Sequence, residues 1–146
     1  MYATAATETR TNAFALVETI DPAAVAVSSA DCDLTYGELD AWSNRLARVL
    51  VELGARPGTR IAVAVDPAIE AAVTRMAVAK TGATAVDGDL VPFGIDIGVT
   101  TKARRAALSD SVDWLVLDDR STLVRYMTGS DAPLTDADRM PVLQAS

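Results

Sequence analysis

DLTYGELDAWSNRLARVLVELG, residues Asp33–Gly54, is the stretch that decides the fold. Thr35 is followed three residues later by Glu38, which is the spacing of a capping box at the start of a helix. Gly54 supplies a residue that readily adopts the left-handed conformation in which many helices end. Between these signals, apolar residues recur at helical spacing and form a single stripe: Leu39, Trp42, Leu46, Val49, Leu50 and Leu53. The stretch therefore predicts one long amphipathic helix.

Shorter segments on both sides predict strands and helices in alternation. Asp66-Pro67 predicts an N-cap followed by a first-turn proline. Residues 87–98, with three glycines and a proline, show no regular pattern. The other expected elements are a helix over 12–20, a hairpin of strands over 24–29 and 34–36, a strand over 60–66, a helix from 67 to 82, a strand over 83–86, a short helix over 101–108, a strand over 113–117 and a weak helix around 123–127.

Strands that alternate with helices at this spacing specify a parallel sheet with helices packed on it. We therefore expect an α/β fold, with an N-terminal helix and hairpin followed by βα units that form a mostly parallel sheet with helices on its faces. The expected domain organisation is a flexible N-terminus over 1–11, one α/β subdomain over 12–127, and a polar tail or linker over 128–146.

Composition excludes several classes of function. The formal charge of −7 and the absence of a basic stripe argue against nucleic acid and anionic membranes as partners. The chain has no histidine, which excludes His-dependent triads and zinc-hydrolase sites. Cys32, the single cysteine, cannot form an internal disulfide. No apolar run approaches the roughly 20 residues of a membrane span, and no secretory signal is recognised, so we expect a cytoplasmic protein.

Three motifs stand in a characteristic order: LTYGELD over 34–40, AVAKTGA over 77–83 and ALSDSVDWLVLDD over 107–119. Together they resemble the N-terminal lobe of adenylate-forming enzymes, the AMP-binding superfamily, and most closely the amino-acid adenylation domains of nonribosomal peptide synthetases. The resemblance is collinear over residues 12–120. It departs after Ala83, where TAVDGD stands in place of the family's Tyr-Val-Pro-Leu-Asp.

The resemblance also implies which parts of the enzyme are missing from this sequence. The family binds ATP phosphates with a loop of the type SGTTGxPKG, and no Gly-rich loop followed by lysine occurs here. We therefore expect no catalytic, cofactor-binding or metal-binding residue, no cofactor, and no adenylation by this chain alone. Asp87, Asp89 and Asp96 are interpreted as a solvated loop rather than a Mg²⁺ or Ca²⁺ site, and Lys80 as a solvent-directed side chain.

The favoured hypothesis is a truncated, non-catalytic adenylation-like protein that acts through protein–protein contacts in nonribosomal peptide or related secondary-metabolite biosynthesis. Its partner would be a second copy or an adenylation or carrier component of a peptide synthetase, and Trp42, Val49 and Trp114 are the candidate interface residues. One alternative is the N-terminal half of a split adenylation enzyme, completed by a chain that carries the phosphate loop. Others are a fragment of a longer enzyme and a small-metabolite-binding α/β module.

Overall fold

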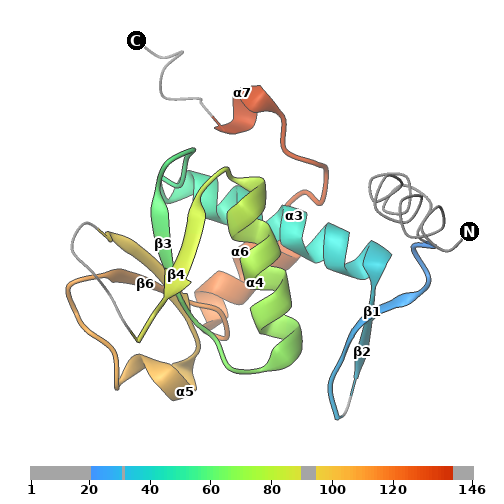
Figure 1. The fold of residues 1–146 in the computed structure, drawn as a ribbon. Coiled ribbons are helices and arrows are strands. Elements are labelled where there is room, and N and C mark those ends of the chain that lie inside the picture. The colour runs from blue at the N-terminus through green and yellow to red at the C-terminus, as the bar shows by residue number, and fades with distance from the viewer. Residues whose placement is uncertain (1–20, 31, 90–94, 140–146) are drawn as a thin grey trace, which may run out of the picture.

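The computed structural model describes residues 21–30, 32–89 and 95–139 (Figure 1). The helix expected over 12–20 lies outside these residues. The elements are β1 (Val25–Ser28), β2 (Asp33–Thr35), α3 (Tyr36–Glu52), β3 (Arg60–Ala64), α4 (Ala68–Lys80), β4 (Thr84–Asp87), β5 (Ile97–Thr100), α5 (Lys102–Arg105), β6 (Asp113–Val116), α6 (Arg120–Thr128) and α7 (Asp136–Arg139).

Four parallel strands form the central sheet in the order β4-β3-β5-β6, and β1 and β2 form a separate antiparallel hairpin. This architecture confirms the predicted α/β fold with its N-terminal hairpin. β5 was not predicted, since its four residues follow an irregular segment and include Gly98. β5 forms because it pairs with β3 on one side and with β6 on the other. The residues of β5 alone do not show this pairing, so the local sequence did not predict a strand.

The long helix α3 has the predicted capping box. The Thr35 backbone N–H donates to Glu38 Oε1 at 2.9 Å, and the Glu38 backbone N–H donates to Thr35 Oγ1 at 3.1 Å. Gly54 follows the helix with a φ of 109°, in the region that favours glycine. The apolar stripe of α3 packs into the main core, where Leu46 and Leu50 are fully buried, together with α4 and one face of the sheet.

Polar side chains join α3 to α4. Lys80 Nζ at the end of α4 donates to Asn44 Oδ1 at 2.7 Å and to Asp40 Oδ1 at 2.8 Å. The buried Asn44 also donates from Nδ2 to the backbone oxygen of Asp131 at 2.9 Å. The expectation that Lys80 is directed to solvent is therefore wrong, because two acceptors on α3 lie within its reach.

The N-terminus of α4 also differs from the prediction. Pro67, rather than Asp66, is the N-cap, and it makes no side-chain capping hydrogen bond. The Asp66 carboxylate instead accepts a hydrogen bond from Arg104 Nη1 at 2.7 Å. An ion pair with a residue 38 positions away thus replaces the local cap that Asp66 would otherwise supply.

The segment after α6 packs on α3 as far as the structure describes it. The Arg48 guanidinium donates to the backbone oxygens of Ala132 and Pro133 at distances of 3.0 and 3.1 Å. Leu134 is buried in the main core. The polar composition of residues 128–146 did not predict these hydrogen bonds, because their acceptors are backbone carbonyl oxygens. Every helix in the described residues is too short or too polar to cross a bilayer.

We predict that Leu46→Ala lowers the free energy of unfolding by about 2–5 kcal/mol, because the side chain is 0% exposed and its removal leaves a cavity. Leu53→Ala, at a residue of the same stripe that is 41% exposed, is the matched control and costs about 1 kcal/mol or less. Urea unfolding measures both values. Equal losses at the two positions would contradict the packing described for α3.

Candidate functional site

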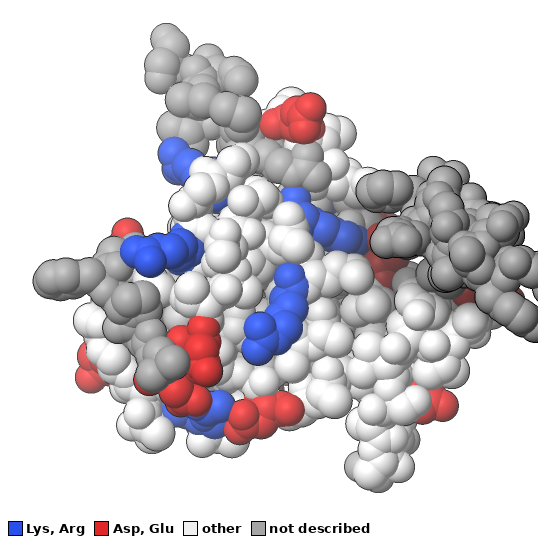
Figure 2. All heavy atoms as spheres, in the orientation of Figure 1, with Lys and Arg blue, Asp and Glu red and all other residues white. Residues whose placement is uncertain are grey.

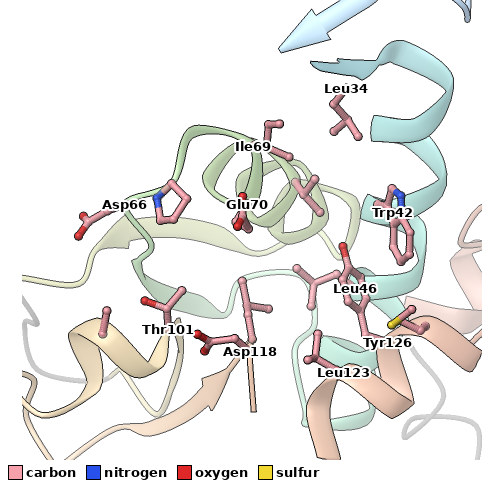
Figure 3. A pocket seen from close by; sticks show the side chains of 15 residues that line it. Leu34, Trp42, Leu46, Asp66, Ile69, Glu70, Thr101, Asp118, Leu123 and Tyr126 are labelled. Carbon is pink, nitrogen blue, oxygen red and sulfur yellow. The ribbon is translucent and has the colours of Figure 1, made fainter. Parts of the chain in front are cut away.

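A cavity of about 510 Å³ lies at the carboxyl ends of the parallel strands (Figure 3). The chain leaves β3 through α4 to reach β4 on one side, and leaves β5 through α5 to reach β6 on the other. Such a reversal of strand order opens a crevice in which α/β proteins commonly hold ligands. Asp66 and Pro67 after β3 and Thr101 after β5 all line the cavity, so it occupies this position in the sheet.

The lining is mostly apolar and comes from α3, α4, α6 and the strand ends. Three of its 15 residues are acidic, and none is basic. The lining residues are Leu34, Trp42, Leu46, Asp66, Pro67, Ile69, Glu70, Val73, Thr101, Ala103, Leu117, Asp118, Leu123, Tyr126 and Met127. A volume of this size and an apolar wall with a few polar groups are typical of small-molecule sites.

An aromatic pair forms the wall between α3 and α6. The rings of Trp42 and Tyr126 lie 5.0 Å apart between centroids with planes tilted by 52°, and the Arg45 guanidinium carbon lies 4.7 Å from the centre of the Trp42 ring. Burial raises the pKa of the Tyr126 hydroxyl well above its ordinary value of 10.0, and the negative charge of Glu70 raises it further, whereas Arg45 acts in the opposite direction. The phenol is therefore neutral at physiological pH.

Two of the rim carboxylates are already engaged. Arg104 binds Asp66 and also Asp89, and the hydrogen bond to Asp89 raises the pKa of Arg104. Asp118 Oδ1 accepts from the backbone N–H of Lys102 at 2.8 Å. Figure 2 shows acidic and basic side chains side by side at the lower edge of the molecule, where α5 lies in Figure 1. The third carboxylate, Glu70, is exposed, and no described residue forms a side-chain hydrogen bond or ion pair with it.

Beside the cavity, α6 presents large apolar side chains to solvent. Leu123, Val124 and Met127 are 37%, 55% and 58% exposed, and Leu123 and Met127 also line the cavity. We call these three residues the α6 patch. At the start of the helix, the Ser121 hydroxyl donates to Asp119 at 2.6 Å and thereby lowers the pKa of that carboxyl group.

The three residues predicted for an interface occupy different environments. Trp42 is half-buried and lines the cavity, whereas Val49 is only 4% exposed and belongs to the core. The half-buried Trp114 packs its ring against Gly98 on the other face of the sheet, at a position where any Cβ would collide with the ring, and its Nε1–H donates to the Ser109 carbonyl at 2.6 Å. Val49 thus has little surface to offer a partner, and a contact at Trp42 or Trp114 stays a prediction.

The sequence did not locate the α6 patch or the residues that line the cavity, although the small-metabolite-binding alternative rested on a site at the carboxyl ends of the strands. Leu123, Val124 and Met127 predicted only a weak helix. Whether the apolar side of that helix is exposed depends on what the rest of the fold covers. Two of the three aspartates considered as metal ligands, Asp87 and Asp89, have partners within the chain. Asp89 binds Arg104, and the Asp87 carboxylate accepts from the Asp89 backbone N–H at 2.9 Å. Within the described part of the chain, no three acidic, cysteine or histidine side chains are grouped as metal ligands.

Comparison with known proteins identifies the fold family. The profile of the family described as AMP-binding enzyme matches residues 14–128. This chain belongs to the AMP-binding enzyme family. The predicted resemblance to adenylate-forming enzymes is thereby confirmed.

The relatives of this AMP-binding family member include very large proteins. A probable non-canonical nonribosomal peptide synthetase, CymA of Salinispora arenicola, is 30% identical over 136 residues, which cover 84% of this chain and 2% of CymA. Malpinin synthetase of Mortierella alpina is 35% identical over 124 residues, covering 80% of this chain and 2% of the synthetase. This sequence therefore corresponds to a small part of each relative's length.

Among solved structures, the nonribosomal peptide synthetase FmoA3 in its α-methyl-L-serine-AMP-bound form superposes with a TM-score of 0.65 at 26% identity. The similarity covers 84% of this AMP-binding family chain and 15% of the FmoA3 chain. The chain is thus similar to part of an adenylation domain of the nonribosomal peptide synthetase type.

We predict that Tyr126 makes the protein less stable in alkali. Because its folded-state pKa lies above 10.0, the unfolded chain releases this proton first, and the free energy of unfolding falls as the pH rises above 10.0 toward the folded-state pKa. The expected slope from this group is up to about 1 kcal/mol per pH unit. Tyr126→Phe keeps the aromatic ring but removes this pH-dependent contribution. Tyr36→Phe, at an exposed tyrosine, is the matched control and leaves the contribution of Tyr126 in place. Urea unfolding between pH 9 and 11 makes the comparison, and identical slopes for Tyr126→Phe and the unchanged protein would refute the prediction.

Proposed function

We propose that this chain is a non-catalytic adenylation-like lobe that acts by binding a peptide-synthetase component in nonribosomal peptide or related secondary-metabolite biosynthesis. The observation that carries the proposal is the α6 patch. Leu123, Val124 and Met127 place three large apolar side chains on one short helix, in contact with solvent. Contiguous apolar surface on a folded domain commonly marks a protein–protein contact.

The size of the relatives supports a protein partner. In CymA and malpinin synthetase the matched region is 2% of the chain, so most of each protein consists of other segments. In FmoA3 the matched region is 15% of the solved chain. A lobe that forms a small part of such proteins has neighbouring surfaces to contact, and the α6 patch is the described surface best suited to one. The partner we favour is an adenylation protein that carries the phosphate loop.

The sequence supports a role in contacts rather than catalysis. It contains no Gly-rich loop followed by lysine, which is the element that the family resemblance assigns to the ATP phosphates. Adenylation depends on positioning and on stabilising charge at the triphosphate. The cavity at the carboxyl edge has acidic lining residues and no basic one, and such a wall does not supply that stabilisation.

A second candidate is the N-terminal half of a split adenylation enzyme, and the AMP-binding match over residues 14–128 favours it. The same binding event would then complete an active site. Pyrophosphate exchange separates the two functions: the non-catalytic role predicts no exchange above that of the partner alone, whereas the split enzyme predicts exchange only in the mixture.

We predict that replacing Val124 and Met127 together by lysine weakens partner binding by about tenfold or more, because two charges enter an apolar contact. The matched control is Val25→Lys, which places lysine at a 50% exposed valine on the β1–β2 hairpin. Biolayer interferometry with an immobilised adenylation protein measures the affinity, and analytical ultracentrifugation measures self-association.

Binding to the adenylation protein that is lost in the double variant and retained in Val25→Lys supports the proposal. Self-association that is lost in the double variant and retained in Val25→Lys would place a second copy on the α6 patch and overturn the choice of an adenylation protein as partner. Equal affinities for both variants, or no association of any kind at 100 μM, would overturn the proposed contact.

A further inference from the structure

We infer that the cavity at the carboxyl edge is a binding site for a small apolar molecule that carries a primary ammonium group. Such a molecule would place its apolar body between α3, α4 and α6 and its ammonium beside Glu70. This inference goes beyond the proposed function, because it concerns a small ligand and does not require a protein partner.

The position and size of the cavity support a ligand. It lies where the strand order reverses, between the residues that follow β3 and β5, and its volume is about 510 Å³. Small-molecule sites in proteins span roughly 300–1,000 Å³ and are mostly apolar. The walls here are made by large side chains from three helices, including Trp42, Val73 and Leu123. A compact aromatic or branched aliphatic body fits this lining.

The charges around the cavity select the head group. Asp66, Glu70 and Asp118 are the three carboxylates in the lining, and no lysine or arginine lines the cavity. Arg104 binds Asp66, and the backbone N–H of Lys102 donates to Asp118, so two carboxylates have partners within the chain. Glu70 is exposed, and no described residue pairs with its carboxylate. It is therefore the acceptor available to an ammonium group.

Tyr126 provides a second polar contact. Figure 3 shows Glu70 and Tyr126 entering the same space from α4 and α6. The Tyr126 hydroxyl is neutral at physiological pH and has no hydrogen-bond partner among the described residues. A neutral hydroxyl can accept a hydrogen bond from an ammonium while Glu70 supplies the opposite charge. The two groups supply polar contacts where α4 and α6 face the cavity.

The same features exclude nucleotides and other anions. Helix N-termini attract phosphate, and α4 begins at this cavity. However, the carboxylates of Asp66 and Glu70 flank that terminus, and Asp118 already occupies the N–H at the start of α5. Arg104 offsets the charge of Asp66, but a phosphate would still enter beside Glu70 and Asp118 with no lysine or arginine in the lining, which costs free energy through like-charge repulsion.

The test uses 2-phenylethylamine as the probe, with 2-phenylethanol and 3-phenylpropanoate as neutral and anionic analogues of similar shape. NMR titration of the purified chain follows the indole N–H signals of its two tryptophans. Trp42 lines the cavity and responds, whereas Trp114 lies on the other face of the sheet and serves as an internal control. The expected order of affinity is amine, then alcohol, then carboxylate, with a Kd for the amine of about 1 mM, as for other fragments of this size.

Three variants separate charge from shape. Glu70→Gln weakens amine binding about two- to fivefold and leaves alcohol binding unchanged. Asp113→Asn, the matched control, removes a carboxylate at the start of β6, away from the cavity, and leaves both unchanged. Leu123→Trp fills the cavity from an exposed position and abolishes binding of both probes.

The inference is overturned if the carboxylate binds as tightly as the amine, if Trp114 shifts as much as Trp42, or if Glu70→Gln and Asp113→Asn behave alike. None of these readouts involves a protein partner or pyrophosphate exchange. Failure here therefore leaves the proposed contact at the α6 patch standing, and failure of that contact leaves this inference standing.

Discussion

The burial of one apolar stripe on α3 is the constraint on which the rest of the structure depends. The stripe places Leu46 and Leu50 in the centre of the main core and holds α4 and the parallel sheet against the helix. One turn before Leu46 in the same stripe, Trp42 packs on Tyr126 and thereby holds α6 against α3. Because α3 contacts both α4 and α6, the space left between these three helices at the strand ends is a defined cavity.

Local signals made the α3 region predictable, whereas the remaining features depend on contacts between distant residues. The capping box of Thr35 and Glu38 involves residues three apart, so the sequence shows it directly. The sequence alone did not predict β5, the ion pair of Asp66 with Arg104, or the hydrogen bond from Lys80 to Asn44. In each case the strand or side chain that completes the contact lies far away along the chain. The lining of the cavity and the α6 patch follow from assembly of the whole lobe, so before the structure the sequence indicated function through the family resemblance and through the expected sheet architecture alone.

The proposed contact role rests on the AMP-binding fold and on the surface of this chain. The family match and the similarity to FmoA3 establish an adenylation-type lobe. In the described residues, however, the carboxyl edge of the sheet holds a mostly apolar cavity with acidic residues and no basic residue in its lining. The neighbouring helix α6 exposes apolar side chains rather than the positive charges that would bind a triphosphate. The proposed protein contact therefore lies at α6, and the proposed ammonium contact lies at Glu70.

Hydrogen–deuterium exchange of the chain, alone and with an adenylation protein that carries the phosphate loop, tests the central claim most directly. The account predicts that the partner slows exchange of backbone amides over α6, residues 120–128, while the β1–β2 hairpin over 25–35 exchanges as it does in the free chain. Protection confined to the hairpin, or no protection at any position when the partner is in excess, would contradict it.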